Sequence, residues 1–153
     1  MFCLDTSVLV SAHCNEAHTA ITLDWLERQS AASLYISNWL VTEFSSALSL
    51  KLRTRQINIQ QRNMALSAFA LMRENTLLDA PVIGSDFIVA AHMLDNHQLG
   101  LRAGDALHLA VASRCGLTLV TLDARMANAG QLLAVNTLLL NAKNQINELS
   151  PEY

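Results

Sequence analysis

Short apolar runs alternate along this chain with longer segments in which apolar residues recur at helical spacing. This alternation is typical of a parallel β-sheet that carries helices on its faces. The apolar runs predict strands over about residues 2–4, 33–36, 77–80, 117–122 and 132–135. We therefore expect an α/β domain with a central parallel sheet.

The segments between the runs predict the helices. Leu40, Phe44, Ala47 and Leu48 stand at positions i, i+4, i+7 and i+8, which places them on one helix face. Further helices are predicted over about residues 17–31, 58–76, 86–95 and 102–115. The helix over 102–115 is apolar nearly all round and is followed by Gly116, a residue that often ends helices, so we expect it to be central.

Acidic residues stand at the predicted edge of this sheet. Asp5 and Asp123 come directly after predicted strands, and Glu43 and Asp105 lie early in predicted helices. Ligands of open α/β sheets bind at the carboxyl ends of the strands, so these acids are expected to converge. Carboxylates that lie close together repel one another unless a cation neutralises them, and a hard divalent ion is the common solution. Mg²⁺ is the first choice.

Each acid also has a simpler interpretation. Asp5 and Asp123 equally suit the N-cap of a following helix. Asp105 suits a cap or an ion pair with Arg102. Glu43 has no basic residue three or four positions away and fits no capping box, so a functional role is favoured for it.

Composition narrows the class of protein. With 153 residues, 52% hydrophobic and 15% charged, the chain suits one compact domain, and its net charge of −3 argues against a broad basic surface for nucleic acid. No apolar stretch reaches the roughly 18 residues that span a bilayer, and the N-terminus lacks a signal-peptide pattern. Three cysteines without CxxC spacing suit reduced thiols. We expect a cytoplasmic protein with no zinc site and no membrane association.

Four motifs surround the acids, and they occur in a fixed order along nearly the whole chain. They are Leu4-Asp5-Thr6-Ser7-Val8-Leu9, Ser37-Asn38-Trp39-Leu40-Val41-Thr42-Glu43-Phe44, Leu101-Arg102-Ala103-Gly104-Asp105-Ala106-Leu107-His108-Leu109-Ala110 and Leu119-Val120-Thr121-Leu122-Asp123. Each motif alone is weak, whereas four in order are fairly specific. Together they resemble the PIN-domain ribonucleases, and specifically the VapC toxins. The resemblance implies a single PIN-like domain over residues 1–153, with a three-layer fold, homodimerisation, an RNA substrate and a cognate VapB-like antitoxin.

The resemblance also implies roles for the residues. Asp5, Glu43, Asp105 and Asp123 match the four catalytic acids of the family, and Thr6, Ser7 and Thr121 match supporting hydroxyl positions. The implied activity is that of an endoribonuclease that depends on Mg²⁺, with Mn²⁺ as a substitute. We expect Asp5, Asp105 and Asp123 to hold the metal. Glu43 is expected either to ligate it or to position the attacking water.

Other polar residues keep two interpretations each. Arg102 is a candidate for contact with RNA or with the antitoxin, or a counter-ion for Asp105. The basic run from Lys51 to Arg55 either binds phosphate or antitoxin, or simply suits a helix C-terminus. For His108 we favour a core or supporting role over a metal-ligand role, because its neighbours are apolar. Asp79 is a rival ligand, and the remaining acids, Asp86 among them, suit solvated faces or caps.

Two other functions are compatible with the sequence. One is a PIN-fold nuclease that acts on DNA or on another phosphate ester. The other is a non-catalytic module that uses the acidic crevice to bind a basic partner.

Overall fold

The computed structural model describes residues 1–141. Its strands form one parallel sheet in the order β3-β2-β1-β4-β5. The strands are β1 (Phe2–Leu4), β2 (Leu34–Ile36), β3 (Leu78–Asp79), β4 (Thr118–Thr121) and β5 (Thr137–Leu139). The helices are α1 (Thr6–His13), α2 (Thr19–Glu27), α3 (Asn38–Arg53), α4 (Ile59–Asn75), α5 (Gly84–Asp95), α6 (Ala103–Cys115) and α7 (Ala124–Leu132), with short 3-10 turns η1 (Ala31–Ser33) and η2 (His97–Leu99).

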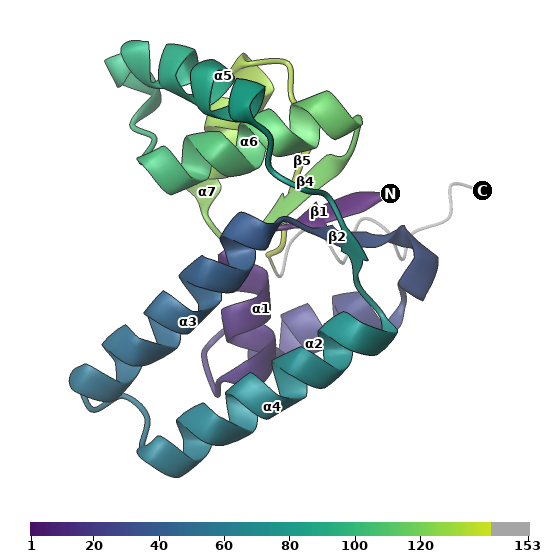
Figure 1. Ribbon diagram of the computed structural model, residues 1–153, viewed down its shortest axis with the longest axis vertical. Coiled ribbons are helices and arrows are strands. Elements are labelled where there is room, and N and C mark those ends of the chain that lie inside the picture. Colours follow the sequence, from purple (N-terminus) through teal and green to yellow (C-terminus); the bar gives the residue numbers. More distant parts are fainter. Residues whose placement is uncertain (142–153) are drawn as a thin grey trace.

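The sheet lies between two layers of helices, with α1 to α4 on one side and α5 to α7 on the other (Figure 1). Successive residues of a strand point to opposite faces of a sheet. Leu4 of β1 accordingly packs with Phe44 of α3, whereas its neighbour Cys3 packs with Leu109 of α6. The expected three-layer α/β fold is therefore confirmed.

Most of the predicted elements are present with nearly the predicted bounds. The strands predicted over 2–4, 33–36, 77–80 and 117–122 correspond to β1, β2, β3 and β4. The helix predicted over 102–115 is α6, and its residues from Ala106 to Ala112 are all buried, as expected of a central helix. Gly116 ends it with a left-handed φ of 64°. The end of the expected domain, residues 142–153, lies outside the described residues.

The last predicted strand is wrong. Residues 132–135 lie at the end of α7 and in the turn after it, where Leu133 N–H bonds to the carbonyl of Ala129 and Ala134 has a φ of 56°. The true strand, β5, follows at Thr137–Leu139. The sequence analysis also predicted neither α1 nor α7. The segment of α1 is a short apolar run without a clear period, so it suits a buried helix and a buried strand alike. The segment of α7 buries mainly alanine and glycine, which mark no apolar face in the sequence.

The two missed helices start directly at the sheet edge. β1 and β4 are paired with Leu4 opposite Val120, so the two chains leave the sheet side by side. Asp5 is the N-cap of α1 and Asp123 is the N-cap of α7. Within residues 1–141, no helix is both long and apolar enough to cross a membrane.

Candidate metal centre

All four predicted acids line one open cleft at the carboxyl edge of the sheet. The cleft has a volume of about 320 Å³, and its walls include Asp5, Glu43, Asp105 and Asp123. The acids come from four segments that are far apart in sequence: the ends of β1 and β4, the second turn of α3 and the first turn of α6. The fold thus brings together what the sequence predicted to converge.

The buried carboxylate of Asp5 is held by one of its two oxygens. Its Oδ2 accepts hydrogen bonds from the Ser7 hydroxyl at 2.5 Å, the Thr121 hydroxyl at 2.9 Å and the Ser7 backbone N–H at 3.3 Å. Ser7 and Thr121 accept in turn from the backbone N–H groups of Leu122 and Asp123. These bonds lock the two strand ends together, and they leave Oδ1 free of hydrogen bonds within the described residues.

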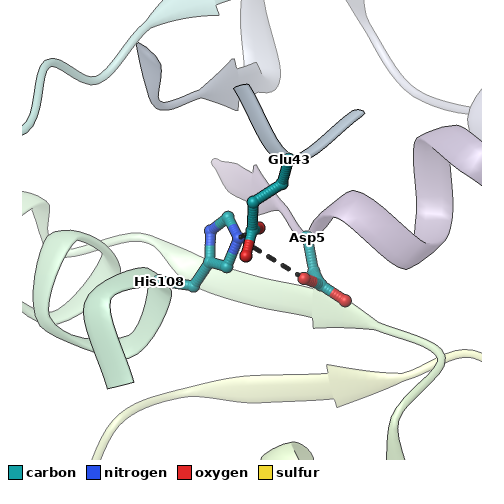
Figure 2. Close-up of side chains that lie close together, drawn as sticks. All are labelled: Asp5, Glu43 and His108. Atoms are coloured by element: carbon teal, nitrogen blue, oxygen red, sulfur yellow. Dashed lines mark hydrogen bonds and ion pairs between the residues drawn. The ribbon is translucent and has the colours of Figure 1, made fainter. Parts of the chain in front are cut away.

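Glu43 meets a buried histidine. Figure 2 shows the His108 ring, from α6, pointing between the carboxylates of Glu43 and Asp5. Its Nε2 lies 2.7 Å from Glu43 Oε2 and 3.6 Å from Asp5 Oδ1. Because a carboxylate can only accept, Nε2 carries the proton and donates. The Thr6 hydroxyl donates to the same Oε2 at 2.6 Å.

These contacts lower the pKa of Glu43 and raise the pKa of His108, so both shifts favour the charged forms. Burial alone would raise the pKa of Glu43, but the hydrogen bonds from His108 and Thr6 outweigh it and hold the pKa below its usual range. Burial alone would lower the pKa of His108, but the bond to Glu43 and the charge of Asp5 outweigh it and raise the pKa. Glu43 is therefore ionised, and His108 is favoured in its charged form.

Asp105 is the most crowded acid of the cleft. Its Oδ2 accepts the backbone N–H of Arg102 at 2.8 Å, which caps the start of α6. Burial, followed by the negative charges of Asp123 and Asp5, raises its pKa, although the hydrogen bond from Arg102 acts in the opposite direction. A raised pKa caused partly by neighbouring carboxylates is the electrostatic signature of a site that favours a cation.

Asp123 is exposed and caps α7. Its Oδ1 accepts the backbone N–H groups of Arg125 at 2.7 Å and Met126 at 3.2 Å. Its Oδ2 makes no hydrogen bond in the part of the chain that the structure describes. Capping and an acidic site were rival interpretations of Asp5 and Asp123, yet one oxygen of each caps a helix while both side chains line the cleft.

The donor set suits a hard divalent cation. Asp5, Asp105 and Asp123 each have one carboxylate oxygen without a hydrogen bond in residues 1–141, and oxygen ligands are those that Mg²⁺ and Mn²⁺ prefer. Asp5, Glu43 and His108 also present ligand atoms within 4.8 Å of one another. However, His108 is 1% exposed and its Nε2 already donates to Glu43, so it supports the carboxylates and is not available as a ligand. The expected supporting role of His108 agrees with this geometry.

Several other predicted residues lie away from the cleft. Lys51 of the basic run pairs with Glu16, and Asp79 is an exposed edge-strand residue that faces Arg73 at 3.8 Å. Neither Lys51 nor Asp79 lines the cleft.

Of the two interpretations of Asp86, the cap is confirmed and the solvated face is wrong, because this acid is buried. It caps the start of α5 by accepting the Ile83 N–H, and it forms an ion pair with Arg114 of α6. This pair fastens α5 to α6.

Three residues near the cleft escaped the sequence analysis. The guanidinium of Arg125 reaches the carbonyl of Gly100 at 3.5 Å, and neither Arg125 nor Arg102 forms an ion pair within the described residues. Gly104 and Trp39 both lie against Glu43. An arginine two residues after a capping aspartate was the available signal for Arg125, whereas no local pattern marks Gly104 or Trp39.

Known folds agree with this architecture. Crystal structures similar to this chain include FitAcB from Neisseria gonorrhoeae, with 19% identity, a TM-score of 0.65 and coverage of 90% of this chain and 96% of that one. VapC20 from Mycobacterium tuberculosis, described as a sarcin-ricin loop cleaving toxin, has 18% identity and a TM-score of 0.69 over 85% and 95% of the two chains. VapBC2 from Rickettsia felis, bound to a DNA fragment from its promoter, has 18% identity and a TM-score of 0.66 over 92% and 98%.

At these identities the likeness concerns the fold. Among curated protein sequences, none matches the chain significantly. The sequence profile of the PIN domain matches residues 2–132, a span that includes all four acids of the cleft. The chain therefore belongs to the PIN domain family.

Proposed function

We propose that this PIN domain is a VapC-like toxin, an endoribonuclease that uses Mg²⁺ to hydrolyse RNA phosphodiester bonds. The observation that carries the proposal is the convergence of Asp5, Glu43, Asp105 and Asp123 on one open cleft. The cleft is open enough to admit a polymer, and its carboxylates suit a divalent ion. The four acids are the proposed catalytic residues.

The proposed metal ligands are Asp5, Asp105 and Asp123, each through the oxygen that makes no hydrogen bond. A bound Mg²⁺ or Mn²⁺ would lower the pKa of water and neutralise charge on the phosphoryl oxygens. The chain supplies the geometry. Thr6, Ser7 and Thr121 hold the carboxylates of Glu43 and Asp5 by hydrogen bonds, so these acids are oriented before any ligand arrives.

Glu43 is proposed to ligate the ion or to orient the attacking water. Its Oε2 already accepts from Thr6 and His108, so Oε1 is the oxygen available to either role. Hydrolysis joins the oxygen of water to phosphorus and breaks one ester bond. The departing oxygen takes a proton, and the water loses one.

Substrate contact is proposed for Arg102 and Arg125, at the starts of α6 and α7. Both are exposed, both lie within three residues of a cleft acid in sequence, and neither forms an ion pair in residues 1–141. Guanidinium groups bind phosphate oxygens in a bidentate manner. Two cations beside an acidic cleft would place the RNA backbone over the carboxylates.

The proposed partners are a VapB-like antitoxin and a second copy of the chain. The similar structures include VapBC2, which supports an antitoxin. An inhibitor that covers the cleft must bring basic groups, because four carboxylates line it. A homodimer is supported by α5, where Ile83, Phe87, Ile88 and Val89 are between 42% and 61% exposed on an apolar surface. We propose a cytoplasmic location, where RNA is available.

The test is cleavage of total cellular RNA by the purified chain with Mg²⁺ or Mn²⁺. Controls are a chelator and the Asp105→Asn variant, whose amide oxygen still accepts the Arg102 N–H and so preserves the cap. We expect discrete fragments that disappear in both controls. Cleavage of DNA but not RNA would favour the other nuclease function, and a folded chain that binds no Mn²⁺ would favour the binding module.

A further inference from the structure

Gly104, the second residue of α6, lies directly against the carboxylate of Glu43. A Cβ atom at position 104 would lie 3.4 Å from the Glu43 carboxyl carbon, 3.3 Å from the indole Nε1 of Trp39 and well inside van der Waals contact with Glu43 Oε1. The φ of Gly104 is not positive, so its backbone does not require glycine. What requires glycine here is space, and the carboxylate fills it.

The other sides of this carboxylate are occupied as well. Oε2 accepts from Thr6 at 2.6 Å and from His108 at 2.7 Å. The buried indole N–H of Trp39, one turn earlier on α3, makes no hydrogen bond in residues 1–141, and it lies close enough to Glu43 to lower the pKa of that carboxyl. Glu43 therefore accepts from donors on α1 and α6, it lies against the indole of Trp39 and against Gly104, and its side chain, 28% exposed, opens onto the cleft.

We infer that Gly104 is a positioning residue for Glu43: the missing side chain creates the seat, beside the indole of Trp39, in which Thr6 and His108 hold the carboxylate. The seat itself rests on geometry alone. Its consequence for RNA cleavage rests on the proposed function.

The cost of a methyl group at position 104 falls on the carboxylate and not on the fold. The nearest atom to the new methyl is Oε1 at the end of the flexible Glu43 side chain, followed by the indole Nε1 of Trp39 at 3.3 Å, and the three nearest atoms include no backbone atom. Alanine is also a better helix former than glycine. The carboxylate must move by roughly 1 Å, and a displacement of that size can reduce a reaction rate by about 100-fold.

The matched control is Gly84, the first residue of α5. It also lies in the first turn of a helix without a positive φ, and a Cβ there would have no atom within 4 Å. We expect Gly104→Ala to lower the rate of RNA cleavage by tenfold or more while the chain stays folded, with a cooperative thermal unfolding transition. Gly84→Ala should retain the wild-type rate.

A double-mutant cycle separates positioning from general damage. Aspartate at position 43 is one methylene shorter, so it withdraws from the space that a methyl at 104 would fill. We expect the Gly104→Ala/Glu43→Asp double variant to be as active as Glu43→Asp alone. If the two substitutions acted independently, their reductions of the cleavage rate would multiply in the double variant, and that outcome would overturn the inference.

A spectroscopic measurement tests the seat without RNA or metal. In protein labelled with ¹⁵N at histidine, the Nε2–H of His108 should give a resonance shifted downfield and protected from exchange by its bond to Glu43. This resonance should shift or disappear in Gly104→Ala and in Glu43→Gln, but not in Gly84→Ala. A wild type that cleaves no RNA would refute the proposed function, while an unchanged His108 resonance in Gly104→Ala would refute the inference.

Discussion

Replacement of Asp5 by asparagine and by alanine should separate two tasks that this residue performs with different oxygens. Oδ2 accepts three hydrogen bonds that tie α1 to the end of β4, while Oδ1 makes none and is the proposed metal ligand. Asparagine keeps an acceptor at the position of Oδ2 and is as good an N-cap as aspartate. Alanine removes both oxygens.

The expected loss in free energy of unfolding follows from the number of hydrogen bonds that Asp5 Oδ2 accepts. A net contribution of about 1 kcal/mol for each of the bonds from Ser7 and Thr121 predicts that Asp5→Ala lowers the free energy of unfolding by about 3 kcal/mol. For a chain of this size that corresponds to a decrease in unfolding temperature of about 6–12 °C. Asp5→Asn should stay within about 1 kcal/mol of the wild type, because its amide adds only an unfavourable contact with the His108 N–H.

Both variants should lose function equally. Loss of a direct ligand should lower Mn²⁺ affinity by more than about 100-fold, since groups that only orient ligands already contribute 10- to 100-fold. The assays are urea denaturation, calorimetric titration with Mn²⁺ and RNA cleavage on the same preparations. Equal destabilisation of the two variants would refute the assignment of Oδ2, and wild-type Mn²⁺ affinity in Asp5→Asn would refute that of Oδ1.

Four further outcomes are expected. Mn²⁺ at 100 times its dissociation constant should stabilise the wild type by about 2.7 kcal/mol, and a chelator should reverse the shift in unfolding temperature. Asp105→Asn should gain less stability from Mn²⁺ in the same assay. Without metal it should unfold at or above the wild-type temperature, because the variant lacks a carboxylate that burial and acidic neighbours disfavour in its charged form, as its raised pKa indicates. Asp86→Asn should lose about 2 kcal/mol near neutral pH by breaking the bond with Arg114. Burial would raise the pKa of Asp86, but the bonds from Arg114 outweigh burial and lower it. The stability that this ion pair contributes is therefore complete above about pH 4 and is lost as the pH falls through the lowered pKa. In acid denaturation, the wild type and Asp86→Asn should converge to the same stability. Gly130→Ala should lower stability by about 1–3 kcal/mol in urea, because its methyl meets the side chain of Thr137 on β5 in a packed core.

The sequence predicted the site better than it predicted the elements around it. The order of strands and acids places Asp5 and Asp123 at one edge because parallel strands all end there. The helices that these acids cap were missed, since α1 is a short run with four consecutive buried residues and no visible polar face. Local pattern does not distinguish such a run from a strand, whereas packing between β1 and α3 does.

Contacts between distant segments lay beyond the sequence. Gly104 and Glu43 are 61 positions apart, and a glycine in the first turn of a helix usually signals only a weak helix former. The same holds for Asp86 and Arg114, 28 residues apart, which pair only because α5 and α6 lie side by side. His108 was favoured as a supporting residue because of its apolar neighbours, but its partners became visible only in the folded chain.

The chain neutralises its four acids unequally. Asp5 receives hydroxyl donors, and Glu43 receives a hydroxyl and an imidazole donor. Within residues 1–141, the hydrogen bonds to Asp105 and Asp123 come only from backbone N–H groups at the starts of α6 and α7. Repulsion between the carboxylates therefore stays uncompensated at Asp105. Burial raises the pKa of this residue most, and the charges of Asp123 and Asp5 raise it further. A cation that enters the cleft relieves most repulsion at this residue, which is why the stability gained from Mn²⁺ should depend on Asp105 more than on the better compensated Glu43.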